Sequence, residues 1–409
     1  MARYSVERVR ECLALGAPVT PVLGSRDLFP DLDVPHYLNA ASVSPLSKPV
    51  TEAMMASLMH QARGGVSAVE HFSASVEGVR SAFGTLVGAA SADVAVLANT
   101  SAGVTAVASC LDWRPGDRVL LFSGDFPTNI TPWQQAAKRY ELELVWMDGD
   151  RFRTDIGGIL DDIEREISRG LRLIAVSAVS FVTGRRRPVE HLARRCRAAD
   201  TELFVDAIQA LGVSPLRMDC GIDYMAAGGH KWLGGPFGTG VMAVAPRRWS
   251  QLGGTVASWL SHPEPLGFLF GDRGLLAHDK PLVRGPAVLE GGAFNGVGAA
   301  GLSTSIGLLN ALGVEAIGEH VDGLNQVLAD GLRSRGWEVL WSEDRRFRAG
   351  AVVVDPKDKH AGDIVVGLAE RGVCAASPNG HLRFAPHWHA NLGDIQAALS
   401  ALDEVVAAH

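Results

Sequence analysis

The sequence predicts an α/β fold, in which a large domain with a mostly parallel sheet flanked by helices is followed by a small C-terminal α/β domain. From about residue 50, short apolar runs rich in β-branched residues alternate with segments of helix length. Strands that are apolar on both faces are typical of a parallel sheet covered by helices on both sides. With 409 residues, 47% hydrophobic and 20% charged, the chain has the length of two domains and the composition of a folded protein.

The candidate strands of the large domain are the apolar runs at 94–97, 118–122, 142–146, 173–177, 203–206 and 240–244. A stretch rich in Gly and Pro, roughly 252–296, breaks the alternation and predicts a long connection with functional loops. Two helical patterns follow, at about 298–312 and 316–335, before a small α/β unit whose last helix begins near Gly393. We expect an N-terminal segment over 1–35, a large domain over 36–290 and a small domain over 291–409, which the N-terminal segment can join.

Charge and composition exclude several classes of partner. The 38 basic and 45 acidic residues leave a net charge of -7, which is not the balance of a nucleic-acid-binding protein. The five cysteines are scattered, without a disulfide framework or a CxxC motif, and this favours a reducing compartment. Because the N-terminus lacks the apolar stretch of a signal peptide and no later run reaches membrane-spanning length, we expect a cytoplasmic protein with no membrane partner.

Lys231 and Asp206 are the most informative pair of residues. Lys231 lies in a glycine-rich, nearly uncharged run, where desolvation lowers the pKa of an amine and makes it a candidate for Schiff-base formation. Asp206 ends an apolar run, at the place where the ring nitrogen of pyridoxal phosphate needs a carboxylate. Gln209 could donate to the phenolic oxygen of the same ring. The alternative for Asp206 is a helix cap.

Three further loops that follow predicted strands carry candidate ligand contacts. Thr100 and Ser101 open a helix after the run at 94–97, so their hydroxyl and N–H groups could hold a phosphate, although an ordinary helix cap explains them too. Phe126 could stack on a flat cofactor, and core packing is its alternative. Ser180 follows another buried run and could face a ligand. The arginines that follow at 185–187 predict a solvated turn.

A metal site near the C-terminus is not favoured. His381, His387 and His389 lie close in sequence, and HxH spacing on a strand would turn two of them to one side. No carboxylate or cysteine is obviously paired with them, so we predict no metal.

Five motifs in order resemble those of the class V aminotransferases. They are Asn-Thr-Ser-Ala-Gly at 99–103, Asp-Phe-Pro-Thr-Asn at 125–129, Ser-x-x-Thr-Gly at 180–184, Val-Asp-Ala-x-Gln at 205–209, and the run from Gly229 to Gly240. The resemblance extends from about Tyr37 to the last helix. It implies a fold-type I enzyme with a seven-stranded sheet in its large domain and with pyridoxal 5'-phosphate as cofactor, in a family that includes cysteine desulfurases, kynureninases and isopenicillin N epimerase-like proteins.

The resemblance also implies roles for the cofactor-binding residues. Lys231 is the Schiff-base lysine, Asp206 the partner of the ring nitrogen, and Gln209 the neighbour of the phenolic oxygen. Phe126 matches the aromatic residue that kynureninases place on the ring. The remaining cofactor contacts that the resemblance implies are Thr100, Ser101 and His230 around the phosphate and Ser180 near the polar edge of the ring.

Substrate and partner contacts follow from three more segments. Arg383, in a segment similar to one of kynureninase, would bind the substrate carboxylate, a bidentate task that suits a guanidinium. Asn39 and Ser42 match the opening of the epimerase-like group, which lines the substrate pocket, with turn or cap duty as the alternative. Asn295 would reach the phosphate of a neighbouring subunit, which implies a homodimer whose active sites are shared across the interface.

Some positions depart from the family pattern. Gly228, Gly229 and Ala293 stand where relatives carry hydroxyl side chains near the phosphate, so fewer side chains would hold it. We interpret Cys374 as a small core residue, because free cysteines are commonly buried, and this disfavours a persulfide-carrying desulfurase.

The predicted chemistry begins with removal of the Cα proton of an amino acid, for which Lys231 is the natural base. We expect transamination or Cβ elimination on a small amino acid, with an epimerase or a kynureninase-type hydrolase as alternatives and a cysteine desulfurase behind them. A non-catalytic binding protein is disfavoured because Lys231, Asp206 and Arg383 are all present. A nucleotide-binding enzyme is disfavoured because the glycines at 234–240 precede a strand rather than follow one.

Overall fold

A computed structural model describes residues 20–271, 274 and 276–407. The absence of a signal peptide, which was predicted from the first residues, concerns a part of the chain outside this range, as does Cys12. The first 19 residues of the predicted N-terminal segment also lie outside it.

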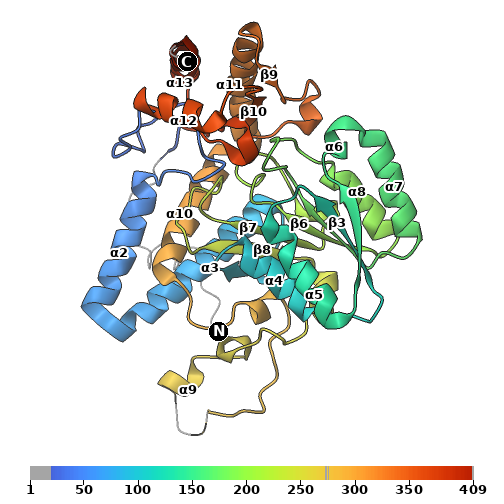
Figure 1. The fold of residues 1–409 in the computed structure, drawn as a ribbon. Coiled ribbons are helices and arrows are strands. Elements are labelled where there is room, and N and C mark those ends of the chain that lie inside the picture. Colours follow the sequence, from blue (N-terminus) through green and yellow to red (C-terminus); the bar gives the residue numbers. More distant parts are fainter. Residues whose placement is uncertain (1–19, 272–273, 275, 408–409) are drawn as a thin grey trace.

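The described residues build a seven-stranded sheet that confirms the predicted fold class (Figure 1). Its strand order is β2-β8-β7-β6-β5-β3-β4. Neighbouring strands from β4 to β7 run parallel, and β8 is antiparallel to both β2 and β7. The strands are β2 (Val94–Leu97), β3 (Arg118–Ser123), β4 (Glu143–Asp148), β5 (Leu173–Ser177), β6 (Glu202–Asp206), β7 (Tyr224–Gly228) and β8 (Gly240–Val244).

Helices cover both faces of this sheet, so that its central strands β5, β6 and β7 are buried on both sides. One face packs against α4 (Thr100–Cys110) and α5 (Thr131–Tyr140). The other face packs against α3 (Ala68–Val87), α7 (Ile156–Ser168), α8 (Val189–Ala198) and α10 (Gly296–Leu312). The long α2 (Lys48–Gly64) lies beside α3 and α10, and the short α6 (Arg151–Thr154) precedes α7.

A second, smaller hydrophobic core belongs to the C-terminal elements. A three-stranded antiparallel sheet of order β12-β10-β9 packs there with three helices, which Figure 1 shows gathered at one end of the molecule. The elements are α11 (Val314–Ser334), β9 (Glu338–Val339), β10 (Val352–Asp355), α12 (Ala361–Glu370), β11 (Val373–Cys374), β12 (Leu382–Phe384) and α13 (Leu392–Ala407).

The beginning of the described chain joins this C-terminal unit. Strand β1 (His36–Tyr37) pairs in parallel with β11, so that Tyr37 faces Cys374. Asn39 and Ala385 form a further parallel bridge. The segment with Asn39 and Ser42 therefore lies beside the strand that carries Arg383, although 340 residues of chain separate them. The predicted division of the chain at residues 35 and 290 stays a prediction.

Across the described ranges no single helix is long and apolar enough to cross a membrane. Only α10 and α11 taken together would meet the length and hydropathy criteria, and this pair is bent by 77°.

The Gly- and Pro-rich connection after β8 contains α9 (Gly267–Phe270), which protrudes from the body of the molecule in Figure 1. Glu290 anchors the end of this connection to the large sheet. Its carboxylate lies 2.5 Å from the guanidinium of Arg80 on α3 and accepts a hydrogen bond of 2.8 Å from the backbone N–H of Val96 on β2. Because Glu290 and Arg80 are both largely buried, the pair is shielded from solvent screening.

We expect Glu290→Ala to lower the free energy of unfolding by about 2–4 kcal/mol, because it leaves the Arg80 cation and the Val96 N–H without their acceptor. Urea denaturation followed by circular dichroism measures the change. The matched control is Glu77→Gln, since Glu77 pairs with the same Arg80 at a more exposed position and should cost less than about 1 kcal/mol. Equal effects of the two variants would contradict the anchoring role of Glu290.

Candidate active site

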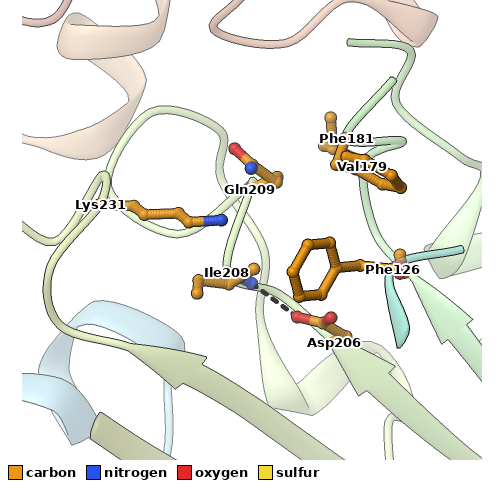
Figure 2. Close-up of a pocket in the computed structure, with 8 residues that line it drawn as sticks. Phe126, Val179, Phe181, Asp206, Ile208, Gln209 and Lys231 are labelled. Atoms are coloured by element: carbon orange, nitrogen blue, oxygen red, sulfur yellow. Dashed lines mark hydrogen bonds between the residues drawn. The ribbon is translucent and has the colours of Figure 1, made fainter. Parts of the chain in front are cut away.

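A cavity opens at the carboxyl ends of β5 and β6, where ligands bind in parallel α/β sheets (Figure 2). Elements far apart in the sequence meet there: the loops after β3, β5 and β6 and the turn after β7. The lining residues are Phe126, Ser177, Val179, Phe181, Asp206, Ile208, Gln209 and Lys231.

Asp206 ends β6, directly beside Ser177 at the end of β5. Asp206 is 3% exposed, and within the described chain the one hydrogen bond of its carboxylate comes from the backbone N–H of Ile208, at 3.1 Å. A turn rather than a helix follows Asp206, so its carboxylate does not cap a helix. Burial raises the pKa of Asp206 to about 6, although the nearby ammonium of Lys231 opposes the rise. The carboxylate is thus underpartnered, and a cation within reach would stabilise it.

Lys231 lies on the turn that follows β7, and Figure 2 shows its amine pointing into the cavity. The pKa of Lys231 is lowered to about 8, mainly by burial; the Asp206 carboxylate opposes this shift and the Arg383 cation adds to it. Its Nζ lies 5.6 Å from the centre of the Phe126 ring. The amine is therefore available in its neutral, nucleophilic form at a pH well below that of an ordinary lysine.

Gln209 separates this cavity from an adjoining one. Its Nε2 donates to the carbonyl of Ala41 at 3.0 Å, and its Oε1 accepts from the indole N–H of Trp232 at 2.9 Å. The second cavity shares Val179, Phe181 and Gln209 with the first and is further lined by Ala41, Ser180, Gly184, Trp232, Gly350, Ala351 and Arg383. Ser180 therefore lies in the adjoining cavity rather than in the cavity of Lys231.

Arg383 on β12 reaches the second cavity from the C-terminal unit. Its guanidinium is buried and donates to the carbonyl of Phe181 at 3.0 Å and to the hydroxyl of Ser42 at 2.9 Å. Its Nε has no partner, and no acidic side chain of the described chain forms an ion pair with it. Burial lowers the pKa of Arg383 to about 10. A buried cation with polar but uncharged partners is a receptor for an anion.

The predicted substrate contacts Asn39 and Ser42 differ in their surroundings. Ser42 accepts the hydrogen bond from Arg383 and thereby orients the guanidinium. The side-chain oxygen of Asn39 is buried without a partner, while Asn39 forms a hydrogen bond with the Cys374 thiol. The tertiary structure thus brings Ser42 directly to the candidate anion receptor.

The predicted phosphate loop forms the N-terminus of α4. Asn99 caps the helix by accepting a hydrogen bond of 2.9 Å from Ala102 N–H, which leaves Thr100 and Ser101 in the first turn. The hydroxyl of Thr100 is buried without a partner, and that of Ser101 lies 2.8 Å from the hydroxyl of Thr128. Free N–H groups and hydroxyls at a helix N-terminus are suited to a phosphate.

His230 and Asn295 have local partners of their own. The ring of His230 stacks on Phe237 with 4.6 Å between the ring centres, and burial lowers the pKa of His230. Asn295 caps α10, because its side-chain oxygen accepts from Gly298 N–H at 2.8 Å. Its amide nitrogen lies 3.4 Å from the carbonyl of Gly238. The contact of Asn295 with the phosphate of a neighbouring subunit stays a prediction.

Packing explains the glycine at position 229. A Cβ atom there would lie 2.6 Å from the Thr239 hydroxyl and 2.9 Å from a methyl group of Leu302. The space that a serine or threonine side chain would occupy is therefore filled by Thr239 and by α10.

The residues present fit pyridoxal phosphate. An underpartnered buried carboxylate, an amine of lowered pKa, an aromatic ring and an unpartnered threonine hydroxyl at a helix N-terminus correspond to the ring nitrogen, the aldehyde, the ring face and the phosphate of that molecule. The fold and this donor set define the class of the protein: a pyridoxal-phosphate enzyme of fold-type I.

The chain belongs to the class-V aminotransferases, because the family model named Aminotransferase class-V matches residues 36–390. The predicted family and its cofactor, pyridoxal phosphate, are thereby confirmed. Among curated proteins, the chain is 28% identical to a probable cysteine desulfurase of Methanothermobacter thermautotrophicus, with 69% of each chain covered. It is 26% identical to an uncharacterized aminotransferase of Bacillus subtilis, over 93% of this chain and 96% of that one.

Two solved structures share the fold. One is the apo structure of a cysteine desulfurase from Thermococcus onnurineus, with a TM-score of 0.83 and 22% identity over 96% of this chain and 100% of that chain. The other is the cystine C–S lyase C-DES in complex with its reaction product cysteine persulfide, with a TM-score of 0.81 and 22% identity over 91% of this chain and 98% of that chain.

Sequence reasoning missed the burial of Arg187. The prediction of a solvated turn at 185–187 is wrong for this residue, which is 2% exposed. Its guanidinium lies 2.5 Å from the carboxylate of Asp125, and the other oxygen of Asp125 accepts from the backbone N–H of Ser177 at 3.1 Å. Asp125 immediately precedes Phe126, so this buried pair fixes the loop that carries the aromatic ring. A run of three arginines contains no local signal that one of them is internal.

The C-terminal histidines do not lie on a strand as the sequence suggested. His387 and His389 follow β12 in irregular chain, and burial lowers their pKa values to about 4 and about 3. His387 donates from Nε2 to the carbonyl of Trp232 at 2.9 Å, and the ring of His389 packs at a tilt against that of Phe29. His381 lies apart, with its Nδ1 near the carbonyl of Asn379. Within residues 20–271, 274 and 276–407, no cluster of three or more His, Cys, Asp or Glu side chains is arranged for a metal.

We expect Arg187→Met to lower the free energy of unfolding of the apoprotein by about 3–5 kcal/mol, because the Asp125 carboxylate then remains buried without its cation. The double variant Asp125→Asn/Arg187→Met should recover much of this loss. Arg335→Met is the control, since its ion pair with Asp403 lies at the surface. A loss in Arg187→Met no larger than in this control, measured by urea denaturation, would refute the structural role of the pair.

The lowered pKa of Lys231 predicts how cofactor uptake depends on pH. Only the neutral amine attacks the aldehyde, so the rate of uptake by apoprotein should rise with pH to a midpoint near 8. Because the Asp206 charge raises the pKa of Lys231, Asp206→Asn should move the midpoint to lower pH, whereas the exposed control Asp219→Asn should leave it in place. Stopped-flow absorbance measures these rates. A midpoint near 10.5 would contradict the described environment of the amine.

Proposed function

We propose that the protein removes the Cα proton of a small α-amino acid and then expels a leaving group from Cβ. The observation that carries this proposal is the convergence of Lys231, Asp206 and Arg383 on two adjoining cavities. Pyridoxal phosphate, when bound, supplies a conjugated ring that accepts the electron pair left on Cα.

Each of the three residues has a distinct task in this proposal. Arg383 grips the carboxylate of the amino acid, because it is a buried cation with a free Nε and no acidic partner in the described chain. Lys231 accepts the Cα proton at Nζ, for which a pKa near 8 is suited close to neutral pH. Asp206 keeps the ring nitrogen protonated, because a cation there compensates its buried charge.

The lining of the cavities supports a substrate with a small, uncharged side chain. Among the described lining residues of the two cavities, Lys231 and Arg383 are the cations, and both already have tasks. Val179, Phe181 and Ala351 provide apolar walls. A second carboxylate on the substrate would find no partner there, and a buried unpaired charge is costly.

Cβ elimination with a sulfur leaving group is supported by the similarity to proteins named cysteine desulfurase and cystine C–S lyase. Transfer of the sulfur to one of the four cysteines that the structure describes is not supported. Burial raises the pKa of all four cysteines in the described chain, Cys110, Cys196, Cys220 and Cys374. Cys374 lies on strand β11, and burial of its thiol outweighs the hydrogen bond from Asn39 that would stabilise a thiolate, which does not favour a mobile carrier.

Transamination is the second candidate. The similarity to the Bacillus subtilis aminotransferase extends over almost the full length of both chains. After the Cα proton has been removed, the two reactions differ in whether a good leaving group is present at Cβ. The substrate side chain therefore decides between them.

The proposed assembly is a homodimer. Exposed apolar side chains gather on and after α2, where Met55, Leu58, Met59 and Val66 are at least 38% exposed. Such a patch supports burial against another chain. Asn295, next to Gly238, is the proposed contact of one subunit with the phosphate site of the other. A cytoplasmic location stays a prediction.

The proposal predicts that the purified protein binds pyridoxal phosphate with a visible absorption band that borohydride removes, and that Lys231→Ala loses the borohydride-stable linkage. Small amino acids with a leaving group at Cβ should release pyruvate and ammonia without an added keto acid. Formation of an amino acid only when a keto acid is added would favour transamination instead. A wild-type protein that cannot be reconstituted with the cofactor would sink the proposal.

A further inference from the structure

Trp232, the residue after Lys231, is held by contacts from three separate segments. Its ring is 1% exposed, and its indole N–H donates to Gln209 Oε1 at 2.9 Å. Its backbone carbonyl accepts from His387 Nε2 at 2.9 Å. A Cβ atom on Gly350 would lie 2.3 Å from the edge of its ring, so glycine at 350 is what allows the C-terminal unit to pack on it.

The hydrogen bond from Trp232 determines which way the amide of Gln209 faces. An indole N–H can only donate, so the Gln209 atom that it meets must be the oxygen. The nitrogen is thereby turned to the other side, where one of its two hydrogens goes to the carbonyl of Ala41 at 3.0 Å. Figure 2 shows the side chain of Gln209 together with Lys231 and Phe126, which line the same cavity.

We infer that Trp232 is a positioning residue, which orients the Gln209 amide so that a hydrogen-bond donor rather than an acceptor is presented to the ligand beside Lys231. The remaining hydrogen of Gln209 Nε2 is then available to an anionic oxygen. The identity of that oxygen as the phenolic oxygen of pyridoxal phosphate rests on the proposed function.

The C-terminal unit takes part in this arrangement. Asn325 on α11 donates to the carbonyl of Gly350 at 3.0 Å, which holds the backbone that packs against the Trp232 ring. His387 donates a hydrogen bond to the backbone carbonyl of Trp232 itself. Because both contacts come from residues beyond 320, the orientation of Gln209 depends on how the C-terminal unit packs on the large sheet.

Loss of this orientation should be visible in the pH dependence of the cofactor spectrum. A donor to the phenolic oxygen weakens the attraction of that oxygen for the proton on the neighbouring nitrogen, which joins Lys231 to the cofactor. Without the donor, the proton is held more tightly. Because a hydrogen bond to a charged group is stronger than one between neutral groups, its loss is expected to raise the midpoint by about one pH unit.

The test is an absorbance titration of reconstituted wild type, Trp232→Phe, Gln209→Leu and the double variant. Trp232→Phe and Gln209→Leu should each raise the pH midpoint of the visible band by about one unit. The double variant should shift no further than Gln209→Leu, because Trp232 acts through Gln209. Trp113→Phe is the control, since Trp113 is also buried but donates to the carbonyl of Ala108, and its midpoint should equal that of wild type.

A second variant covers the case in which Trp232→Phe does not fold. Gly350→Ala keeps both hydrogen-bonding side chains and displaces the indole ring, so it should raise the midpoint in the same direction by a smaller amount. An unchanged midpoint in Trp232→Phe or Gly350→Ala, or additive shifts in the double variant, would overturn the inference. A wild type that lacks the visible band contradicts the proposed function itself, and so the two failures are distinguishable.

Discussion

Three buried charges without sufficient partners are the constraint on which the site depends. Asp206, Lys231 and Arg383 line two adjoining cavities. Burial raises the pKa of Asp206 and lowers the pKa values of Lys231 and Arg383, so that in each case the neutral form is favoured. Such charges are tolerated only when the surrounding structure holds them rigidly and a ligand compensates them. The carboxylate, amine and guanidinium are therefore best understood as one receptor for a molecule that is cationic at one end and anionic at the other.

The parallel sheet explains why this receptor forms. Strands β5 and β6 run side by side and end together at Ser177 and Asp206, so the loops that follow them face the same cavity. The antiparallel β8 returns the chain from the Lys231 turn into the sheet, where it lies between β7 and the edge strand β2. Arg383 belongs to the C-terminal unit. The pairing of β12 with β10 and the hydrogen bond to Ser42 position its guanidinium at the second cavity.

A layer of supporting interactions surrounds the receptor, and each joins distant segments. Arg187 forms an ion pair with Asp125, the residue before Phe126, and Trp232 donates a hydrogen bond to the amide oxygen of Gln209. Both supports are buried, so that a group removed from either leaves a partner without compensation. Beside Gly229, Thr239 and Leu302 occupy the space that a larger side chain would need.

The fold class, the family and the receptor residues Asp206, Lys231 and Arg383 could all be predicted from the amino-acid sequence. Short apolar runs that alternate with helices predict strands, because a strand buried on both faces must be apolar on both faces. Asp206 stands at the end of such a run, which predicts that it lies at the carboxyl end of the sheet. Strand β7 escaped that reasoning because its Tyr-Met-Ala-Ala-Gly run lacks β-branched residues. The tertiary structure alone decided the burial of Arg187, the orientation of the Gln209 amide and the meeting of Ser42 with Arg383. Each depends on partners that are remote in the chain, and local patterns of hydropathy carry no information about which remote side chains will compensate a buried polar group.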